Sequence, residues 1–141
     1  MILTDSIYFS SYFYRMKSQP EYNLQKQVCQ WLSKNHPEIL YLSDTIASVK
    51  LTKPQAIRNK SIQKQGFKTP DLLIFEPNKK YKGLFIELKV KSPFKKNGEL
   101  LKCEHLEGQQ KTINDLNEKG YFACFSWSFE MTIEIIENYL K

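Results

Sequence analysis

The segment TPDLLIFEPNKKYKGLFIELKVKS contains two apolar runs that predict neighbouring β-strands, and three charged residues interrupt them. The runs Leu72–Phe75 and Leu84–Val90 are rich in branched and aromatic residues and are joined by a Lys-rich turn. Asp71 precedes the first run, and Glu87 and Lys89 lie inside the second. Because burying an unpaired charge costs several kcal/mol, charges inside a central strand need partners or a metal ion.

Alternation along the second run separates its side chains onto two faces of the predicted strand. One face is apolar throughout and carries Leu84, Ile86, Leu88 and Val90. The other face carries Phe85, Glu87 and Lys89. A solvent-exposed strand alternates in the same way, but here Gly83 and Phe85 flank the charges and the preceding run is apolar on both faces. This pattern favours a buried strand with a functional charged edge.

Asp71 is the expected partner of these charges. Pro70 prevents a helix from continuing, which places Asp71 at the start of its strand, beside Glu87 if the two strands pair. Two carboxylates at one sheet edge suit a hard divalent cation such as Mg²⁺ or Mn²⁺ better than zinc. Lys89, on the same face as Glu87, could orient or deprotonate an attacking water. The residues alone therefore predict a site for metal-assisted hydrolysis.

The net charge of +6 is unevenly distributed along the 141 residues. Residues 50–102 contain 14 Lys and Arg and 4 Asp and Glu, a local balance of +10, whereas the remainder balances to −4. A basic segment of this kind is typical of a polyanion binder or of a solvated Lys-rich surface, and the charge alone leaves both open. The residues that we expect to contact phosphates are Lys53, Arg58, Lys60, Lys64, Lys68 and Lys91.

Length and composition indicate one globular unit, in which an aromatic-rich arm at residues 1–20, a candidate for self-association, precedes a domain at residues 21–141. Three scattered cysteines favour reduced thiols and a cytoplasmic location, and we expect no signal peptide and no membrane span. Cys103 and His105 lack the second pair of ligands that a zinc site needs.

Periodicity and capping signals predict an α/β fold, with a mixed sheet flanked by helices on both faces. A first helix is expected from Glu21 to about Pro37, followed by one or two short strands or an irregular edge. Thr52 could cap a basic helix that ends just before Gly66. After the two central strands, the segment KSPFKKNGELLKCEHLE predicts a loop with a short helix. A helix at 109–119, a strand at YFACFSW and a last helix capped by Ser128 complete the order.

Several of these segments together resemble the virus-type replication-repair nuclease (VRR-NUC) family of restriction-endonuclease-like enzymes. Asp71 after Pro70, then Glu87-Leu88-Lys89 sixteen residues later, has the PD…ExK form of such nucleases. The surrounding GFKTPDLLIF, YKGLFIELK, QQKTINDLNEKGYFACF and IIENYL follow the order of that family over about residues 21–140. The chain departs from the family pattern in GFKTPDL, in SDTIASVKL and in an insertion between Lys89 and Gln109.

The resemblance implies a restriction-endonuclease-like αβββαβ core and cleavage of DNA with Mg²⁺ or Mn²⁺. It makes Asp71 and Glu87 metal ligands together with the main-chain carbonyl of Leu88, and it lets Glu21 complete the metal shell. Lys89 becomes the residue that positions water, and Gln109 would support the site or touch the backbone near the scissile phosphate.

The expected function is therefore a metal-dependent DNA endonuclease. The resemblance of stand-alone family members to junction resolvases implies a homodimer that cuts branched DNA, such as four-way junctions or flaps. Two alternatives remain open at this point: a DNA-binding module that keeps the fold without catalysis, and a metal-dependent RNase.

Overall fold

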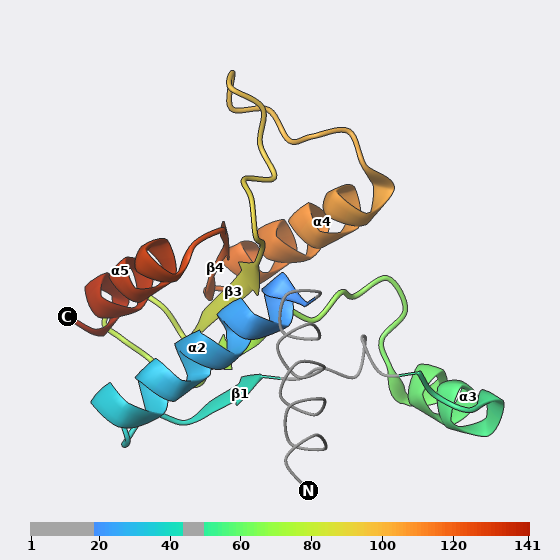
Figure 1. Ribbon diagram of the computed structural model, residues 1–141, viewed down its shortest axis with the longest axis horizontal. Helices are drawn as coiled ribbons and strands as arrows, with labels where there is room; N and C mark the ends of the chain where they lie inside the picture. The colour runs from blue at the N-terminus through green and yellow to red at the C-terminus, as the bar shows by residue number, and fades with distance from the viewer. Residues whose placement is uncertain (1–18, 44–49) are drawn as a thin grey trace, which may run out of the picture.

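The computed structural model describes residues 19–43 and 50–141, and the predicted arm at residues 1–20 lies almost entirely outside this part of the chain. The elements are arranged as a sheet with helices on both sides (Figure 1). Their bounds in chain order are α2 Pro20–Asn35, β1 Tyr41–Ser43, α3 Lys53–Ile62, β2 Leu72–Ile74, β3 Leu84–Leu88, α4 Glu104–Glu118, β4 Phe122–Ser126 and α5 Phe129–Leu140.

The four strands form one mixed sheet in the order β1-β2-β3-β4. β1 pairs antiparallel with β2, β2 pairs antiparallel with β3, and β3 pairs parallel with β4. The parallel pair needs a crossover, which α4 provides. This arrangement confirms the predicted α/β fold with an αβββαβ core, in which α3 is an additional helix between β1 and β2.

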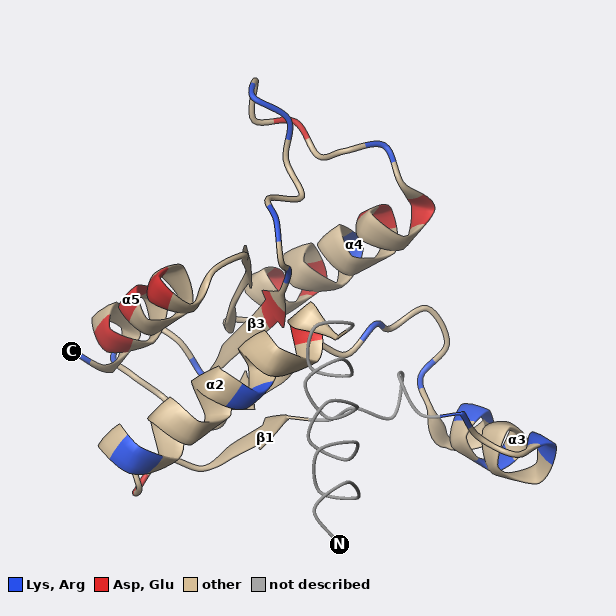
Figure 2. Cartoon of the chain, in the orientation of Figure 1, with Lys and Arg blue, Asp and Glu red and all other residues tan. Residues whose placement is uncertain are grey.

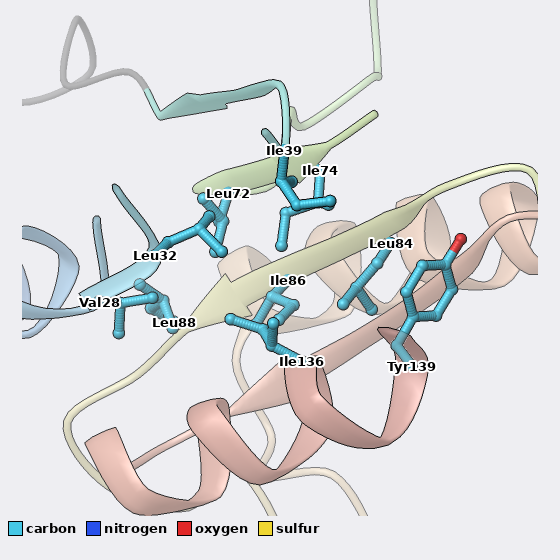
Figure 3. Packing of buried hydrophobic residues seen from close by; sticks show 10 residues of the cluster. All are labelled: Val28, Leu32, Ile39, Leu72, Ile74, Leu84, Ile86, Leu88, Ile136 and Tyr139. Atoms are coloured by element: carbon cyan, nitrogen blue, oxygen red, sulfur yellow. The ribbon is translucent and has the colours of Figure 1, made fainter. Parts of the chain in front are cut away.

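β3 is one of the two central strands, and all five of its residues are buried. Its side chains alternate as predicted, so that Leu84, Ile86 and Leu88 pack on one side with residues of α2 and α5 (Figure 3). Phe85 points to the other side and packs with Ile113 and Leu116 of α4. The two apolar clusters thus cover the sheet on both faces, which leaves no solvent-exposed face for Glu87.

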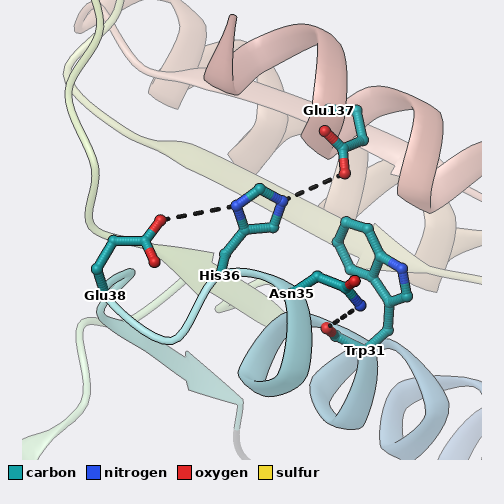
Figure 4. A network of polar contacts seen from close by, with 5 residues as sticks. All are labelled: Trp31, Asn35, His36, Glu38 and Glu137. Carbon is teal, nitrogen blue, oxygen red and sulfur yellow. Dashed lines mark hydrogen bonds and ion pairs between the residues drawn. The ribbon is translucent and has the colours of Figure 1, made fainter.

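A polar network closes one end of the α2–α5 layer. The imidazole of His36 lies 3.2 Å from a carboxylate oxygen of Glu137 and 3.7 Å from one of Glu38 (Figure 4). The ring of His36 also packs against Trp31, with centroids 5.4 Å apart. These contacts tie the end of α2 to α5 at the end of the sheet away from Asp71.

Three predicted boundaries are wrong. The second central strand ends at Leu88, two residues before the predicted end, and Val90 is 46% exposed. α3 ends at Ile62, four residues before Gly66. α4 begins at Glu104 and not at the predicted residue 109. The prediction missed the first residues of the helix because Gly108 weakens the local helical signal, although it does not end the helix.

α3 stands apart from the two-sided core, as Figure 1 shows. A capping box between Thr52 and Gln55 begins it, and none of its residues is buried. Ile57 is 69% exposed and Ile62 is 84% exposed. The helix carries basic residues and no acidic ones (Figure 2), so its exposed surface is both positive and partly apolar. None of the helices within residues 19–43 and 50–141 has the length and apolar character to cross a membrane.

We expect two Ile→Ala substitutions, one in the core and one in α3, to differ in their effect on the free energy of unfolding. Ile86 is fully buried in β3, so Ile86→Ala should lower the free energy of unfolding by about 2–5 kcal/mol through lost burial and a cavity. Ile57→Ala removes the same atoms from an exposed position and should change the free energy of unfolding by less than about 0.5 kcal/mol. Urea denaturation measures both, and equal losses would contradict the separation of α3 from the core.

Candidate metal-dependent hydrolytic site

Asp71 and Glu87 come together because of the register between β2 and β3. Leu72 pairs with Ile86, so continuing the register by one residue places Asp71 opposite Glu87. A carboxylate oxygen of Asp71 accepts a 2.8 Å hydrogen bond from the amide of Leu88, which fixes the side chain across the strand end. The predicted juxtaposition of the two carboxylates is therefore present.

The main chain of Asp71 is held from the opposite side by α2 and β1. Its carbonyl accepts hydrogen bonds from Ser43 Oγ at 2.7 Å and from Gln25 Nε2 at 3.4 Å. Gln25 Nε2 also donates to Ser43 Oγ at 2.6 Å. The sequence reasoning missed Gln25 and Ser43, since neither lies near Asp71 in the chain. The only sequence signal for these two residues is that Gln25 is a polar residue on the inner side of the first helix.

Glu87 is 6% exposed, although it carries a carboxyl group. Gln109 Nε2 donates to Glu87 Oε1 at 2.7 Å, and Gln109 is also 6% exposed. The neighbouring Gln110 instead donates to Asn114 on the surface of α4. The structure thus distinguishes the two adjacent glutamines, and the predicted one meets the carboxylate.

Burial raises the pKa of Glu87 to about 9. Repulsion from the carboxylate of Asp71 and a hydrogen bond between the two carboxyl groups act in the same direction, and the charge of Glu21 adds a smaller contribution. The ammonium of Lys89 opposes the shift. Such a pKa keeps the carboxyl group of Glu87 protonated at neutral pH, next to the carboxylate of Asp71. A cation bound there would favour the ionised form of Glu87 and lower this pKa.

Lys89 follows β3 and keeps its side chain beside the carboxylates. Its Nζ lies 4.0 Å from Glu87 Oε1, and its side chain is 14% exposed. The main chain is fixed where the Lys89 amide donates to the carbonyl of Ser126 at 2.8 Å. Ser126 is itself buried and shares a 2.7 Å hydrogen bond with Thr132 at the start of α5. Lys89 is thus anchored through β4 to α5.

The donor set fits a hard divalent cation. Asp71 and Glu87 supply carboxylate oxygens, and Leu88 lies between Glu87 and Lys89 at the same strand end. The buried Oε1 of Gln109 has no hydrogen-bond partner, so the polar groups around Glu87 are incompletely satisfied. Among the described residues, no three His, Cys, Asp or Glu side chains are grouped closely enough to hold a metal ion by themselves. Carbonyl and water oxygens would therefore complete the coordination.

The remaining predicted site residues are not in direct contact with Asp71 and Glu87 in any hydrogen bond or ion pair found among the described residues. Glu21 is exposed at the start of α2 and acts on Glu87 only over a distance, so its role as a ligand stays a prediction. Lys68 precedes the Asp71 strand, and Lys91 is exposed shortly after Lys89. The other predicted phosphate contacts lie on or just after α3 and are all exposed: Lys53, Arg58, Lys60 and Lys64.

The raised pKa of Glu87 predicts how the stability of the metal-free protein depends on pH. Between pH 4.5 and about 9 the folded state keeps a proton that the unfolded state releases, so stability should fall as the pH rises through this window. Glu87→Gln mimics the protonated form and should exceed the wild type at pH 8 by a few kcal/mol. This difference should vanish near pH 4.5.

Urea denaturation at a series of pH values in EDTA measures this difference. Glu130→Gln, on the first turn of α5, is the matched control for loss of a carboxylate. Parallel stability curves for the wild type and Glu87→Gln would contradict a buried, proton-binding Glu87.

Comparison with known proteins supports the fold found here. The chain matches no protein-family model and no curated protein. It does superimpose on a solved structure of a VRR_NUC domain protein with a TM-score of 0.56 and 21% sequence identity, covering 85% of this chain and 87% of that one. The resemblance to the VRR-NUC family that the sequence indicates is thus confirmed at the level of the fold, and this chain has the fold of a VRR-NUC domain.

Proposed function

We propose that this protein is a nuclease that hydrolyses phosphodiester bonds in DNA with Mg²⁺ or Mn²⁺. The observation that carries the proposal is the buried Glu87, paired in register with Asp71 and hydrogen-bonded to Gln109. Burying a carboxylate in a central strand is costly unless it is paired, and groups with strongly shifted pKa values cluster at functional sites. The VRR-NUC fold adds independent support.

Each residue of the site has a distinct task in this proposal. Asp71 and Glu87 would hold the cation, which supplies stabilisation of the charge that develops on the phosphate oxygens. Lys89 would orient the attacking water, because its ammonium is fixed beside the carboxylates at the same strand end. Gln109 would keep the Glu87 carboxylate in one orientation through its 2.7 Å hydrogen bond.

DNA is the proposed substrate because the basic residues lie on the segments that precede the Asp71 strand. Residues 50–70 contain six Lys and Arg and no Asp or Glu. α3 carries part of this charge on a helix with no buried residue, set apart from the rest of the described chain (Figure 2). A polyanion is the partner that such a helix suits. The family resemblance further favours branched DNA and a homodimer as the active form.

A cleavage assay tests the proposal directly. Wild-type protein in Mg²⁺ or Mn²⁺ should cut at least one DNA among linear duplex, flap and four-way junction. Asp71→Asn and Lys89→Met should each lower the rate by about 10²–10⁴-fold, because one loses a ligand and the other the group that orients water. Asp115→Asn and Lys111→Met are matched controls, since this exposed ion pair lies on the surface of α4.

Two outcomes would overturn the assignment. Unchanged cutting by Asp71→Asn would place the chemistry elsewhere, and tight DNA binding without any product would favour a catalytically silent module. Offering single-stranded and structured RNA to the same preparation separates a DNase from an RNase.

We expect α3 to contribute to DNA affinity without contributing to chemistry. Replacing its basic residues and the one that follows by Gln should weaken binding and lower the magnitude of the salt slope, by up to about 0.9 for each phosphate that is no longer neutralised. The residues to replace are Lys53, Arg58, Lys60 and Lys64. The rate at saturating DNA should stay within about twofold, since the site is unchanged.

Fluorescence anisotropy in Ca²⁺ at several salt concentrations measures this effect. The control variant replaces four lysines at the other end of the sheet or on distant helix ends by Gln, namely Lys34, Lys79, Lys119 and Lys141. Equal losses of affinity in the two variants would show that net charge matters and α3 does not.

A further inference from the structure

Lys68 lies along one face of α4 and is held at both of its ends. Its amide donates to Thr112 Oγ1 at 3.1 Å, and its Nζ lies 3.4 Å from Nδ1 of His105. Thr112, Gly108 and His105 are spaced by four and three residues, so they form one stripe on the helix. Lys68 therefore runs along this stripe towards the start of α4.

Gly108 makes this path possible. A Cβ at position 108 would come within 3.0 Å of Lys68 Cδ and even closer to its Cε. Glycine inside a helix costs up to about 1 kcal/mol relative to alanine, so its presence needs a reason. Room for the aliphatic part of Lys68 is such a reason.

The ammonium of Lys68 differs from those of several other lysines in the described part of the chain. Among the described residues, no carboxylate lies within ion-pair distance of Lys68, whereas Lys89, Lys95 and Lys111 each have one. Its neighbour is the ring of His105. An ammonium can only donate, so this contact favours the tautomer of His105 in which Nδ1 accepts and the proton on Nε2 is a second donor.

Both residues lie at the edge of the proposed catalytic site. Lys68 is three residues before Asp71, and His105 is one helical turn before Gln109 on the same face of α4. The pKa of His105 is lowered, first by burial and then by the charges of Lys68 and Lys89, while Glu21 and Asp71 oppose the shift. The pair is therefore electrostatically coupled to the groups of the site.

We propose that Lys68 and His105 form a substrate-positioning pair that binds a phosphodiester group next to the one that is cleaved. The pair supplies an ammonium and an imidazole N–H from two segments that also carry Asp71 and Gln109, so a DNA strand bound there is fixed relative to the carboxylates. The inference rests on the proposed function for the nature of the ligand.

DNA binding in Ca²⁺ tests the pair without requiring cleavage. Lys68→Gln should weaken the affinity for a fluorescein-labelled 12-nucleotide strand by about 3–10-fold and lower the magnitude of the salt slope by about 0.7. Gly108→Ala removes no polar group but displaces the Lys68 side chain, so it should also weaken binding. Lys111→Gln, an exposed lysine on the same helix, is the matched control.

The two histidines of the chain allow a second, site-specific measurement. In NMR spectra of the imidazole groups, the DNA strand should shift the resonances of His105 and leave those of His36, which is paired with Glu137 (Figure 4), unchanged. The His105 shift should be reduced in Lys68→Gln and in Gly108→Ala. Thermal denaturation verifies that both variants are folded.

The outcomes separate this inference from the proposed function. If Asp71→Asn abolishes cleavage but Lys68→Gln binds DNA as Lys111→Gln does and His105 does not shift, the positioning pair is wrong and the nuclease proposal stands. If no nucleic acid is cut but the Lys68 and Gly108 variants lose affinity and His105 shifts, the pair is supported and the nuclease proposal fails.

Discussion

The register between β2 and β3 is the constraint on which the rest of the site depends. It brings Asp71 opposite Glu87, and the hydrogen bond from the Leu88 amide to Asp71 fixes the two strand ends together. A shift of one residue would turn Glu87 towards the α2–α5 cluster and move Leu88 and Ile86 to the opposite face. The apolar side chains of β3 therefore do more than fill the core, because their burial on one face decides where the carboxylate lies on the other.

The remaining elements hold this strand end from different directions. α2 and β1 bind the main chain of Asp71 through Gln25 and Ser43, α4 binds Glu87 through Gln109, and β4 binds the main chain of Lys89 through Ser126. Each of these contacts joins residues far apart in the sequence. The site is consequently a product of the whole αβββαβ core, and the unfavourable burial of Glu87 is offset by the packing of elements that have no chemical role themselves.

The centre of the site could be predicted from the sequence better than its surroundings, for physical reasons. Alternation and the cost of burying charge identify Asp71, Glu87 and Lys89 from local sequence, and the same reasoning predicts the central strands and the class of sheet. The contact between Lys68 and His105 spans 37 residues, and it forms only because α4 packs beside the segment that leads into β2. Local sequence therefore indicates Lys68 only as one of several phosphate contacts, and His105 only as an incomplete zinc ligand set.

The basic residues of this chain fall into two physical classes. Those of α3 lie on a ten-residue helix with no buried side chain. Isolated helices of that length are marginal in water, so the capping box stabilises α3 where core packing does not. Lys68 is instead held by Thr112, Gly108 and His105 against a helix of the core. A flexible cation costs ordering entropy when it binds a phosphate, whereas a prepositioned one costs less. Under the proposed function, the first class would supply affinity along a length of DNA, and the second would place one phosphate beside Asp71.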